Sequence, residues 1–245
     1  MNKASDNAEM TKMARRNNDD KPCKSDVLLI IPAYNEAGNI ERVVDELIKD
    51  YPQFDYVVVT DGPTDGTDRI CAYRGYNTVN LPENMGLALC FHNGMKYAAD
   101  MGYKYAVQFD GDGQHRPEYI EAMKLKADEG YDLVMGSRFI GLDNHMNAVR
   151  SLGSHIIKLA ILIRTGVRVT DPTCGLRLYD RKLIKLFAAH TDLAPEPDTV
   201  AKLIKGGARV AEVPVKVADR EAGESYLKPA KAAKYMLRMI KAILF

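Results

Sequence analysis

The sequence lacks tryptophan and has only four cysteines among its 245 residues. Cys23, Cys71, Cys90 and Cys174 lie far apart, with no CxxC pair and no spacing typical of zinc ligands. This argues against a structural zinc site. We expect four free thiols, as is usual for a protein of a reducing compartment.

Excess charge and long apolar runs are also missing. The 34 basic and 33 acidic residues give a net charge of +1, which argues against a nucleic-acid partner. The longest apolar stretch, Ile156–Ile163, is interrupted by Lys158 and is far shorter than the ~20 residues that span a bilayer. The polar N-terminus has no apolar region typical of a signal peptide. We therefore expect a soluble or peripheral protein, not an integral one.

The chain divides into three predicted parts. Residues 1–25 are rich in Asn, Asp, Lys and Arg without periodicity, which predicts a disordered tail. Residues 26–227 alternate apolar runs with segments of helical spacing, and residues 228–245 have the pattern of a basic amphipathic helix. No internal repeat or low-complexity linker divides the middle part, so we expect one domain there.

Within this domain, predicted strands alternate with predicted helices. The expected strands are Asp26–Ile31, Tyr56–Thr60, Thr78–Leu81, Tyr105–Phe109 and Leu133–Met135. Helical spacing follows the first strand, a short helix follows the second, and Gly86–Met101 follows the third. This order predicts an α/β fold with a Rossmann-like, doubly wound and mostly parallel sheet.

Three polar clusters follow three of these strands. They are PAYNE (Pro32–Glu36), DGPTDGT (Asp61–Thr67) and DGDGQH (Asp110–His115). In a doubly wound sheet, ligands bind at the carboxyl ends of the strands. The three clusters are therefore expected to form one site.

The third cluster suggests a divalent cation. Asp110 and Asp112 can direct carboxylate oxygens at one Mg²⁺ or Mn²⁺, and Gln114 can add a third oxygen directly or through water. One alternative is a solvated acidic turn. Another is a calcium loop of the EF-hand type ending at Glu121, but His115 stands where that loop requires glycine.

The second cluster also has two interpretations. Asp61 can accept hydrogen bonds from a nucleotide base or ribose. Alternatively, the segment is an ordinary turn in which Thr64 or Asp65 caps the following helix.

Taken in order, the motifs resemble those of family 2 glycosyltransferases with the GT-A fold. The matching segments are IPAYNE, DGPTDGT, LPENMG, FDGDGQH, GSR, DPTCGLR and REAGESY. They are most similar to the dolichyl-phosphate mannose synthase and polyprenyl-phosphate glycosyltransferase branch, over Asp26–Leu227. The sequence departs from the family pattern at Thr60, Pro63, Leu87 and Tyr226. The QxxRW signature of processive synthases is absent, which favours transfer of a single sugar.

The resemblance implies a role for each matched residue. The nucleotide-sugar site would contain Pro32, Tyr34, Glu36, Asp61, Asp65, Asn84, Gly86, Asp110 and Gly111. The metal would be held by Asp110, Asp112 and Gln114, and the acceptor phosphate by Arg138, Arg150, Ser154 and Arg220. The catalytic set would be Asp112, Arg138 and Arg220, with Glu196 and Asp198 as candidate bases.

The implied activity is an inverting, Mg²⁺- or Mn²⁺-dependent transfer of one hexose. The donor would be of the UDP-glucose or GDP-mannose class, and the acceptor a polyprenyl phosphate. Transfer to a sugar hydroxyl of a surface polysaccharide is an alternative that needs Glu196 or Asp198 as a base. The other interpretation of these two residues is that they cap the following helix. A degenerate, partner-binding module is another alternative to this activity. A nucleotidyltransferase lacks support without a basic Gly-rich loop, as does a dehydrogenase without GxGxxG.

The C-terminal segment is predicted to reach the membrane. Lys231, Lys234, Arg238 and Lys241 fall on one face of a helix, and apolar residues fill the other. Such a helix is typical of a membrane interface with anionic lipid. We expect it to bind the cytoplasmic membrane surface or a small membrane protein; packing on the domain core is the alternative.

Overall fold

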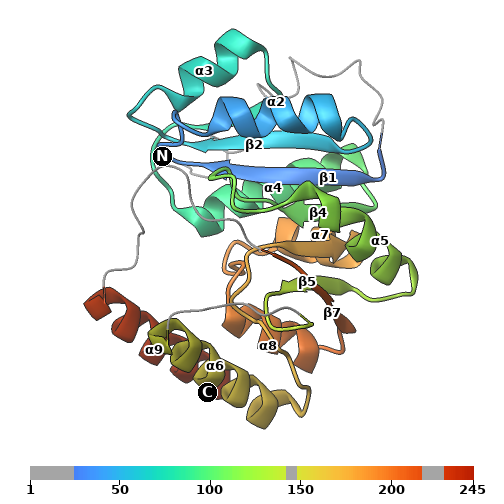
Figure 1. The fold of residues 1–245 in the computed structure, drawn as a ribbon, viewed down its shortest axis with the longest axis vertical. Coiled ribbons are helices and arrows are strands. Elements are labelled where there is room, and N and C mark those ends of the chain that lie inside the picture. Colours follow the sequence, from blue (N-terminus) through green and yellow to red (C-terminus); the bar gives the residue numbers. More distant parts are fainter. Residues whose placement is uncertain (1–24, 142–147, 217–228) are drawn as a thin grey trace.

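A computed structural model describes residues 25–141, 148–216 and 229–245, with side chains of the last two segments described from Gly153 and Tyr235 onward. Its centre is a seven-stranded sheet with the order β3-β2-β1-β4-β6-β5-β7 (Figure 1). The strands are β1 (Val27–Ala33), β2 (Asp55–Asp61), β3 (Thr78–Leu81), β4 (Tyr105–Gln108), β5 (Leu133–Ser137), β6 (Arg177–Asp180) and β7 (Val210–Pro214). The mostly parallel α/β sheet predicted from the sequence is confirmed.

One strand reverses the direction of the sheet. β6 runs antiparallel to both of its neighbours, β4 and β5, whereas the other pairs are parallel. Arg177 at the start of β6 therefore pairs with Gln108 at the end of β4. As a result, the loop that enters β6 lies at the same sheet edge as the carboxyl ends of the parallel strands.

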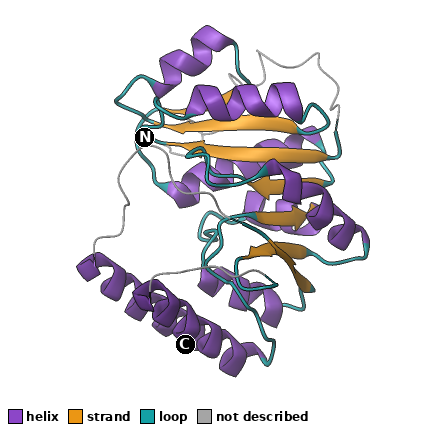
Figure 2. Cartoon of the chain, in the orientation of Figure 1, coloured by secondary structure: helices purple, strands orange, loops and turns teal. Residues whose placement is uncertain are grey.

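Helices cover both faces of the sheet (Figure 2). They are α2 (Ile40–Asp50), α3 (Thr67–Arg74), α4 (Leu87–Met101), η1 (Pro117–Tyr119), α5 (Ile120–Asp128), α6 (Ala148–Thr165), α7 (Arg181–Ala189), α8 (Pro197–Lys205) and α9 (Pro229–Leu244). Leu28 and Ile30 of β1 pack in the core with α4, and Leu29 and Ile31 pack in a second core with α2. A strand buried on both faces is a continuous apolar run, which explains the sequence VLLII.

β6 and β7 are not among the strands predicted from the sequence. β6 reads RLYD, and its first residue, Arg177, is a charged side chain that is nevertheless buried. β7 reads VAEVP and carries Glu212 on its half-buried side. A charged residue interrupts the apolar pattern of a strand, and here tertiary hydrogen bonds compensate for the burial of Arg177 and the partial burial of Glu212.

The C-terminal helix packs on the domain. α9 lies beside α6 (Figure 1), and its Met239 and Ile243 are buried in the same core as α4. The packing alternative for the C-terminal segment therefore holds for the apolar side of α9. In the described parts of the chain, no helix has the length and apolar character that crossing a bilayer requires.

Candidate active site

The three polar clusters meet at one edge of the sheet. Pro32 and Ala33 of β1 pair with Val59 and Thr60 of β2, and Ile30 pairs with Gln108 of β4. The loops that follow these parallel strands therefore leave the sheet side by side. This is the arrangement predicted for PAYNE, DGPTDGT and DGDGQH.

Side-chain hydrogen bonds join the first loop to the second. Asn35 adopts a left-handed conformation with φ of 56°, and its Oδ1 accepts a hydrogen bond from the Thr64 amide at 2.8 Å. Asp65 accepts from the amide of Ala37 at 2.9 Å and from the amide and hydroxyl of Thr67 at 3.0 and 2.6 Å. Burial pushes the pKa of Asp65 upward, but these hydrogen bonds outweigh it and lower the pKa. Asp65 thus holds the two loops together.

Asp61 is directed at the protein backbone. It is buried at the end of β2, and its two carboxylate oxygens accept hydrogen bonds from the amides of Met85 and Gly86 at 2.7 and 2.9 Å. These amides lead into α4, and the preceding Asn84 is exposed. The structure thus gives Asp61 the role of fixing the start of α4 beside the second loop.

Gly111 allows the DGDG segment to lie against the first loop. A Cβ atom at Gly111 would lie 3.2 Å from the carbonyl oxygen of Pro32 and 3.8 Å from Cγ of Glu36. Glu36 is held in turn, because its Oε2 accepts a hydrogen bond from Asn39 at 2.8 Å. Tyr34, which lies between Pro32 and Glu36 in the sequence, is half-buried. The close contact brings Pro32, Glu36 and the acidic segment together.

Hydrogen bonds and close contacts position Asp110 and Asp112, the acidic pair. The amide of Asp110 donates to Nδ1 of His115 at 3.0 Å, and Nε2 of the same ring lies 3.5 Å from Oδ2 of Asp110. Asp112 is buried, and its Oδ1 accepts a hydrogen bond from the Gln114 amide at 3.0 Å. A Cβ atom at Gly175 would lie 3.0 Å from Oδ2 of Asp110. The position of the Asp110 carboxylate therefore depends on glycine in a distant loop.

These residues suit a hard cation that is shared with a substrate. Within the residues that the structure describes, no group of three or more His, Cys, Asp or Glu side chains is placed to hold a metal by itself. Mg²⁺ is usually held by one or two carboxylates together with substrate phosphates. The two carboxylates of Asp110 and Asp112 match this type of ligand set. The backbone amide of Gln114 donates a hydrogen bond to Asp112. The metal contact predicted for Gln114 would therefore come from its side-chain oxygen.

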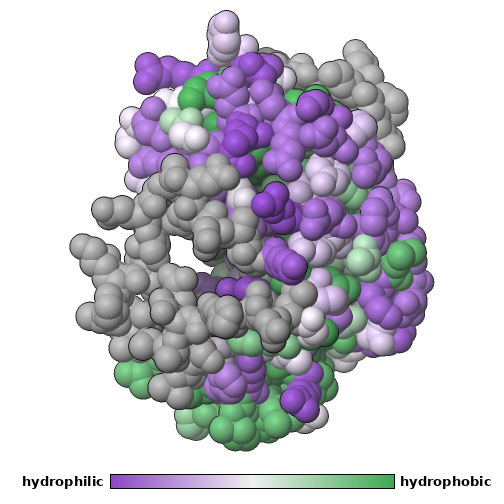
Figure 3. All heavy atoms as spheres, in the orientation of Figure 1, coloured by the Kyte–Doolittle hydropathy of each residue, from purple (hydrophilic) through white to green (hydrophobic). Residues whose placement is uncertain are grey.

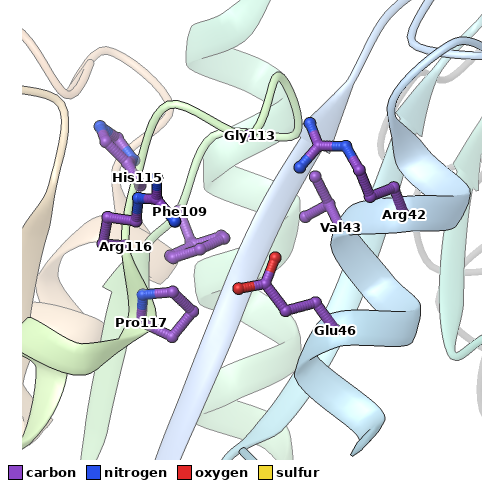
Figure 4. A pocket seen from close by; sticks show the side chains of 8 residues that line it. All are labelled: Arg42, Val43, Glu46, Phe109, Gly113, His115, Arg116 and Pro117. Carbon is purple, nitrogen blue, oxygen red and sulfur yellow. The ribbon is translucent and has the colours of Figure 1, made fainter. Parts of the chain in front are cut away.

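A small pocket lies behind the DGDG segment (Figure 4). Arg42 and Glu46 of α2 line one side, and His115 and Arg116 line the other. The guanidinium of Arg42 packs on Gly113, because a Cβ there would lie 2.3 Å from Nη2 of Arg42. Arg42 was not predicted from the sequence, since a single Arg on a helix has no distinctive spacing. It supports the segment from the α2 side.

The loop before β6 holds Arg138. Asp171, which is completely buried, accepts from Nε and Nη2 of Arg138 at 2.6 and 2.9 Å. Nη2 also donates to the hydroxyl of Thr173 at 2.9 Å. Burial alone would lower the pKa of Arg138, but the hydrogen bonds and charge of Asp171 raise it. Arg138 is thus a fixed cation at the carboxyl end of β5.

Two further charged residues hold the same loop. Glu212 of β7 accepts from the amides of Thr170 and Asp171 at 2.7 and 2.8 Å. The buried Arg177 donates to the carbonyl oxygens of Pro172 and Cys174 at 2.8 and 3.0 Å. Sequence reasoning missed both roles, and the charges inside otherwise apolar segments were the available signal. The segment 170–177 is therefore held by hydrogen bonds from two strands, and it contacts both Arg138 and Asp110.

The two candidate bases have partners within the fold. Glu196 is the residue before α8, and it accepts a hydrogen bond from the hydroxyl of Tyr235 in α9. Arg238 lies 3.9 Å from its other carboxylate oxygen. Asp198 forms an ion pair with Lys202 at 3.0 Å. Glu196 therefore attaches α9 to α8 and makes no side-chain cap, contrary to the capping alternative.

The remaining predicted acceptor residues are described only in part. Ser154 of α6 is buried, and its hydroxyl has no hydrogen-bond partner among the described residues. Arg150 lies in the first turns of α6, but its side chain is outside the described part, and Arg220 is outside it entirely.

The fold and this edge define an α/β transferase of the GT-A type. The chain belongs to glycosyl transferase family 2, whose family model matches residues 28–187. It is therefore a glycosyltransferase, as the motif order suggested.

Curated relatives and solved structures agree with this assignment. The chain is 28% identical to polyprenol monophosphomannose synthase of Mycolicibacterium smegmatis, over 86% of the chain and 84% of the relative. It is 30% identical to undecaprenyl-phosphate mannosyltransferase of Micrococcus luteus, over 81% of the chain and 86% of the relative. Glucosyl-3-phosphoglycerate synthase of Mycobacterium tuberculosis, in complex with Mn²⁺, UDP and phosphoglyceric acid, has a TM-score of 0.60 at 16% identity, covering 95% of this chain and 80% of that one. This last likeness concerns the fold alone.

Proposed function

We propose that the protein transfers one hexose, with inversion, from a nucleotide-diphosphate sugar to a polyprenyl phosphate at the cytoplasmic face of a membrane. The observation that carries the proposal is that the Asp110–Asp112 pair and the cation Arg138 both lie against one hydrogen-bonded loop, 170–177. Two relatives whose names specify mannose transfer to polyprenyl or undecaprenyl phosphate support this acceptor. The donor is of the GDP-mannose or UDP-glucose class.

The donor end of the site is the acidic edge. Pro32, Tyr34, Glu36 and Asp65 form the wall of the nucleotide pocket, and Gly111 keeps this wall close to the acidic pair. Asp110 and Asp112, with Gln114, hold Mg²⁺ or Mn²⁺. The bound cation supplies positive charge that offsets the charge on the departing diphosphate.

The acceptor end is cationic. A polyprenyl phosphate is already ionised near neutral pH, so its oxygen attacks the anomeric carbon without a general base. Arg138, Arg150, Ser154 and Arg220 orient the phosphate, because guanidinium groups match its geometry. Asp171 gives Arg138 a fixed direction, which reduces the orientational cost of the reaction.

A sugar-hydroxyl acceptor receives less support from the structure. It would need a base, and the carboxylates of Glu196 and Asp198 are engaged with Tyr235 and Lys202. A degenerate, partner-binding module has equally little support, because the buried Asp112 and partly exposed Asp110 both persist at the sheet edge.

The proposal is tested by incubating the purified protein with a vesicle-borne polyprenyl phosphate, Mn²⁺ or Mg²⁺, and each of several UDP- and GDP-hexoses. Mass spectrometry should detect a hexosyl-phosphate lipid with one donor. Asp112→Asn should reduce the rate by at least ~100-fold, since metal charge stabilisation is worth several kcal/mol. In titration calorimetry, the same variant should lose the Mn²⁺ dependence of nucleoside-diphosphate binding.

Asp50→Asn is the matched control, because it removes an exposed carboxylate from the far end of α2. It should leave both readings unchanged. Nucleotide binding that is independent of metal, with no lipid product from any donor, would refute the proposal in favour of a partner-binding module.

A further inference from the structure

The outer side of α6 is apolar and exposed. Ile156, Leu159 and Ile163 have exposed fractions of 41%, 56% and 69%, and their spacing of three and four residues puts them on one stripe of the helix. Leu162, which is 40% exposed, extends this surface. We call these four residues the α6 outer face.

The inner side of α6 is also apolar. Ile157, Ala160 and Ile161 are buried in the domain core. α6 therefore carries apolar side chains on two sides, whereas a helix with one side in water normally has polar residues there. Hydrophobic residues gather at the end of the molecule that α6 and α9 form (Figure 3). Such an exposed patch marks an interaction surface.

Positive charge accompanies this surface. The segments of α6 and α9, 34 residues together, contain seven Lys or Arg and no Asp or Glu. The rest of the chain contains 27 basic and 33 acidic residues, so the positive charge is concentrated on two neighbouring helices. A protein partner that complements this basic and apolar surface would have to be both strongly acidic and apolar. An anionic bilayer supplies negative charge and an apolar layer together.

The apolar side of α9 is already occupied. Met239 and Ile243 are buried, and Tyr235 is bound to Glu196 at the start of α8. The exposed residues of α9 include Arg238, Lys241 and Leu237. α9 therefore contributes Leu237 and positive charge to the surface, and most of the exposed apolar side chains come from α6.

The same helix reaches the proposed acceptor site. Lys158 of α6 lies 3.5 Å from the centre of the Phe139 ring, just after Arg138 in the sequence. Burial lowers the pKa of Lys158, and the charges of Asp171 and Glu212 act on it in the opposite direction, so it stands near loop 170–177. One side of α6 thus borders the catalytic edge, while its outer face points away from the core.

We infer that the α6 outer face lies in the interfacial layer of an anionic membrane, with the cations of α6 and α9 at the lipid headgroups. The membrane contact itself is argued independently of the proposed function. The inference rests on that function only for the role of the contact, which is to bring the protein to its lipid acceptor. A lipid phosphate at headgroup level would then be close to Arg138 and Ser154. The sequence led us to expect that the C-terminal helix places its apolar side in the membrane. Instead, α9 packs its apolar side on the domain and presents its cations to the lipid headgroups.

The test is flotation of the full-length protein with protein-free vesicles of phosphatidylcholine containing 30% phosphatidylglycerol. The double variant Leu159→Ser/Ile163→Ser should bind at least ~10-fold more weakly, because two large apolar side chains no longer enter the bilayer. Raising the salt concentration should weaken wild-type binding, and vesicles of phosphatidylcholine alone should bind it poorly.

Ile48→Ser/Leu125→Ser is the matched control. It removes two apolar side chains of similar exposure, 49% and 64%, from α2 and α5. Its flotation should equal that of the wild type. Equal flotation of the α6 variant and the wild type, or no flotation of the wild type, would overturn the inference and favour a protein partner.

Enzyme assays separate this inference from the proposed function. The α6 variant should retain nucleotide binding and transfer to a short, water-soluble prenyl phosphate, and lose rate only with the long-chain lipid in vesicles. A wild type that floats but transfers no sugar to either acceptor would refute the proposed function and leave the membrane surface standing. Loss of rate on both acceptors by the variant, with unchanged flotation, would contradict the inference.

Discussion

Asp171 accepts two hydrogen bonds from the guanidinium of Arg138, from Nε at 2.6 Å and from Nη2 at 2.9 Å, across 33 residues of sequence. Asp171 has no exposed surface, and Glu212 fixes the amide of the same residue from β7. The pair therefore joins β5, the loop before β6, and β7 at the catalytic edge. Removing one partner leaves the other charge without its match in a largely buried position.

Asp171→Ala should destabilise the protein by about 3 kcal/mol, as expected when one member of a buried ion pair is lost. Urea unfolding followed by circular dichroism measures this. Glu129→Ala, which breaks the exposed ion pair with Lys126, should cost clearly less. An equal loss of unfolding free energy in the two variants would show that the Asp171–Arg138 pair stabilises the fold no more than an exposed ion pair does.

Gly175→Ala should reduce the transfer rate by roughly 10- to 100-fold, because its Cβ would meet the Asp110 carboxylate and the His115 ring. Steady-state kinetics should show the loss mainly in kcat, with little change in thermal unfolding. Gly206→Ala is the control, since its Cβ would make ordinary contacts 3.4 Å from carbonyl oxygens. An unchanged kcat for Gly175→Ala would mean that Asp110 tolerates displacement.

Glu196→Gln and Asp198→Asn should each change the rate of transfer to a lipid phosphate by less than ~3-fold. A general base contributes about 10²- to 10⁴-fold, and an ionised phosphate needs none. Glu196→Gln should instead lower stability by about 1 kcal/mol through its weakened hydrogen bond to Tyr235. A 100-fold loss of rate in either variant would revive the sugar-hydroxyl acceptor.

Asp65 should make stability depend on pH on the acid side. Its pKa in the folded protein is lower than the value of about 3.9 in the unfolded chain. The ionised carboxylate therefore stabilises the fold above about pH 4, and this contribution is lost as the pH falls through the folded-state pKa. The stability difference between wild type and Asp65→Asn, from urea unfolding at pH 7 and pH 3, should shrink at pH 3. A difference that stays constant would contradict this assignment.

The buried thiols should be unreactive in the native protein. Burial raises the pKa of Cys71 to about 11 and that of Cys174 to about 11, so about one thiol in a thousand is ionised at pH 8. In a Cys23→Ser background, Ellman's reagent should label the folded protein over hours and three thiols within minutes after unfolding. Rapid labelling of the folded protein would indicate an opening of the core around these residues.

Local sequence pattern determined the strands of the parallel half and the ends at which chemistry follows them. The apolar run VLLII predicts a strand buried on both faces, and the polar clusters that begin at Pro32, Asp61 and Asp110 follow strands whose direction is set by the alternation with helices. Hydrophobic periodicity is a local property, so neighbouring residues suffice to reveal it. The family motifs extended that reading to the reaction class.

The tertiary structure alone decided what each polar group faces. Asp61 binds the amides before α4, Asp171 binds Arg138, and Gly175 makes room for Asp110. It also assigned the apolar side of α9 to the core and left the outer face of α6 exposed. Hydrogen-bond partners and packing surfaces depend on segments that are distant in sequence and meet only after the sheet has formed. No local pattern records which of several acidic, basic or apolar segments will be the neighbour.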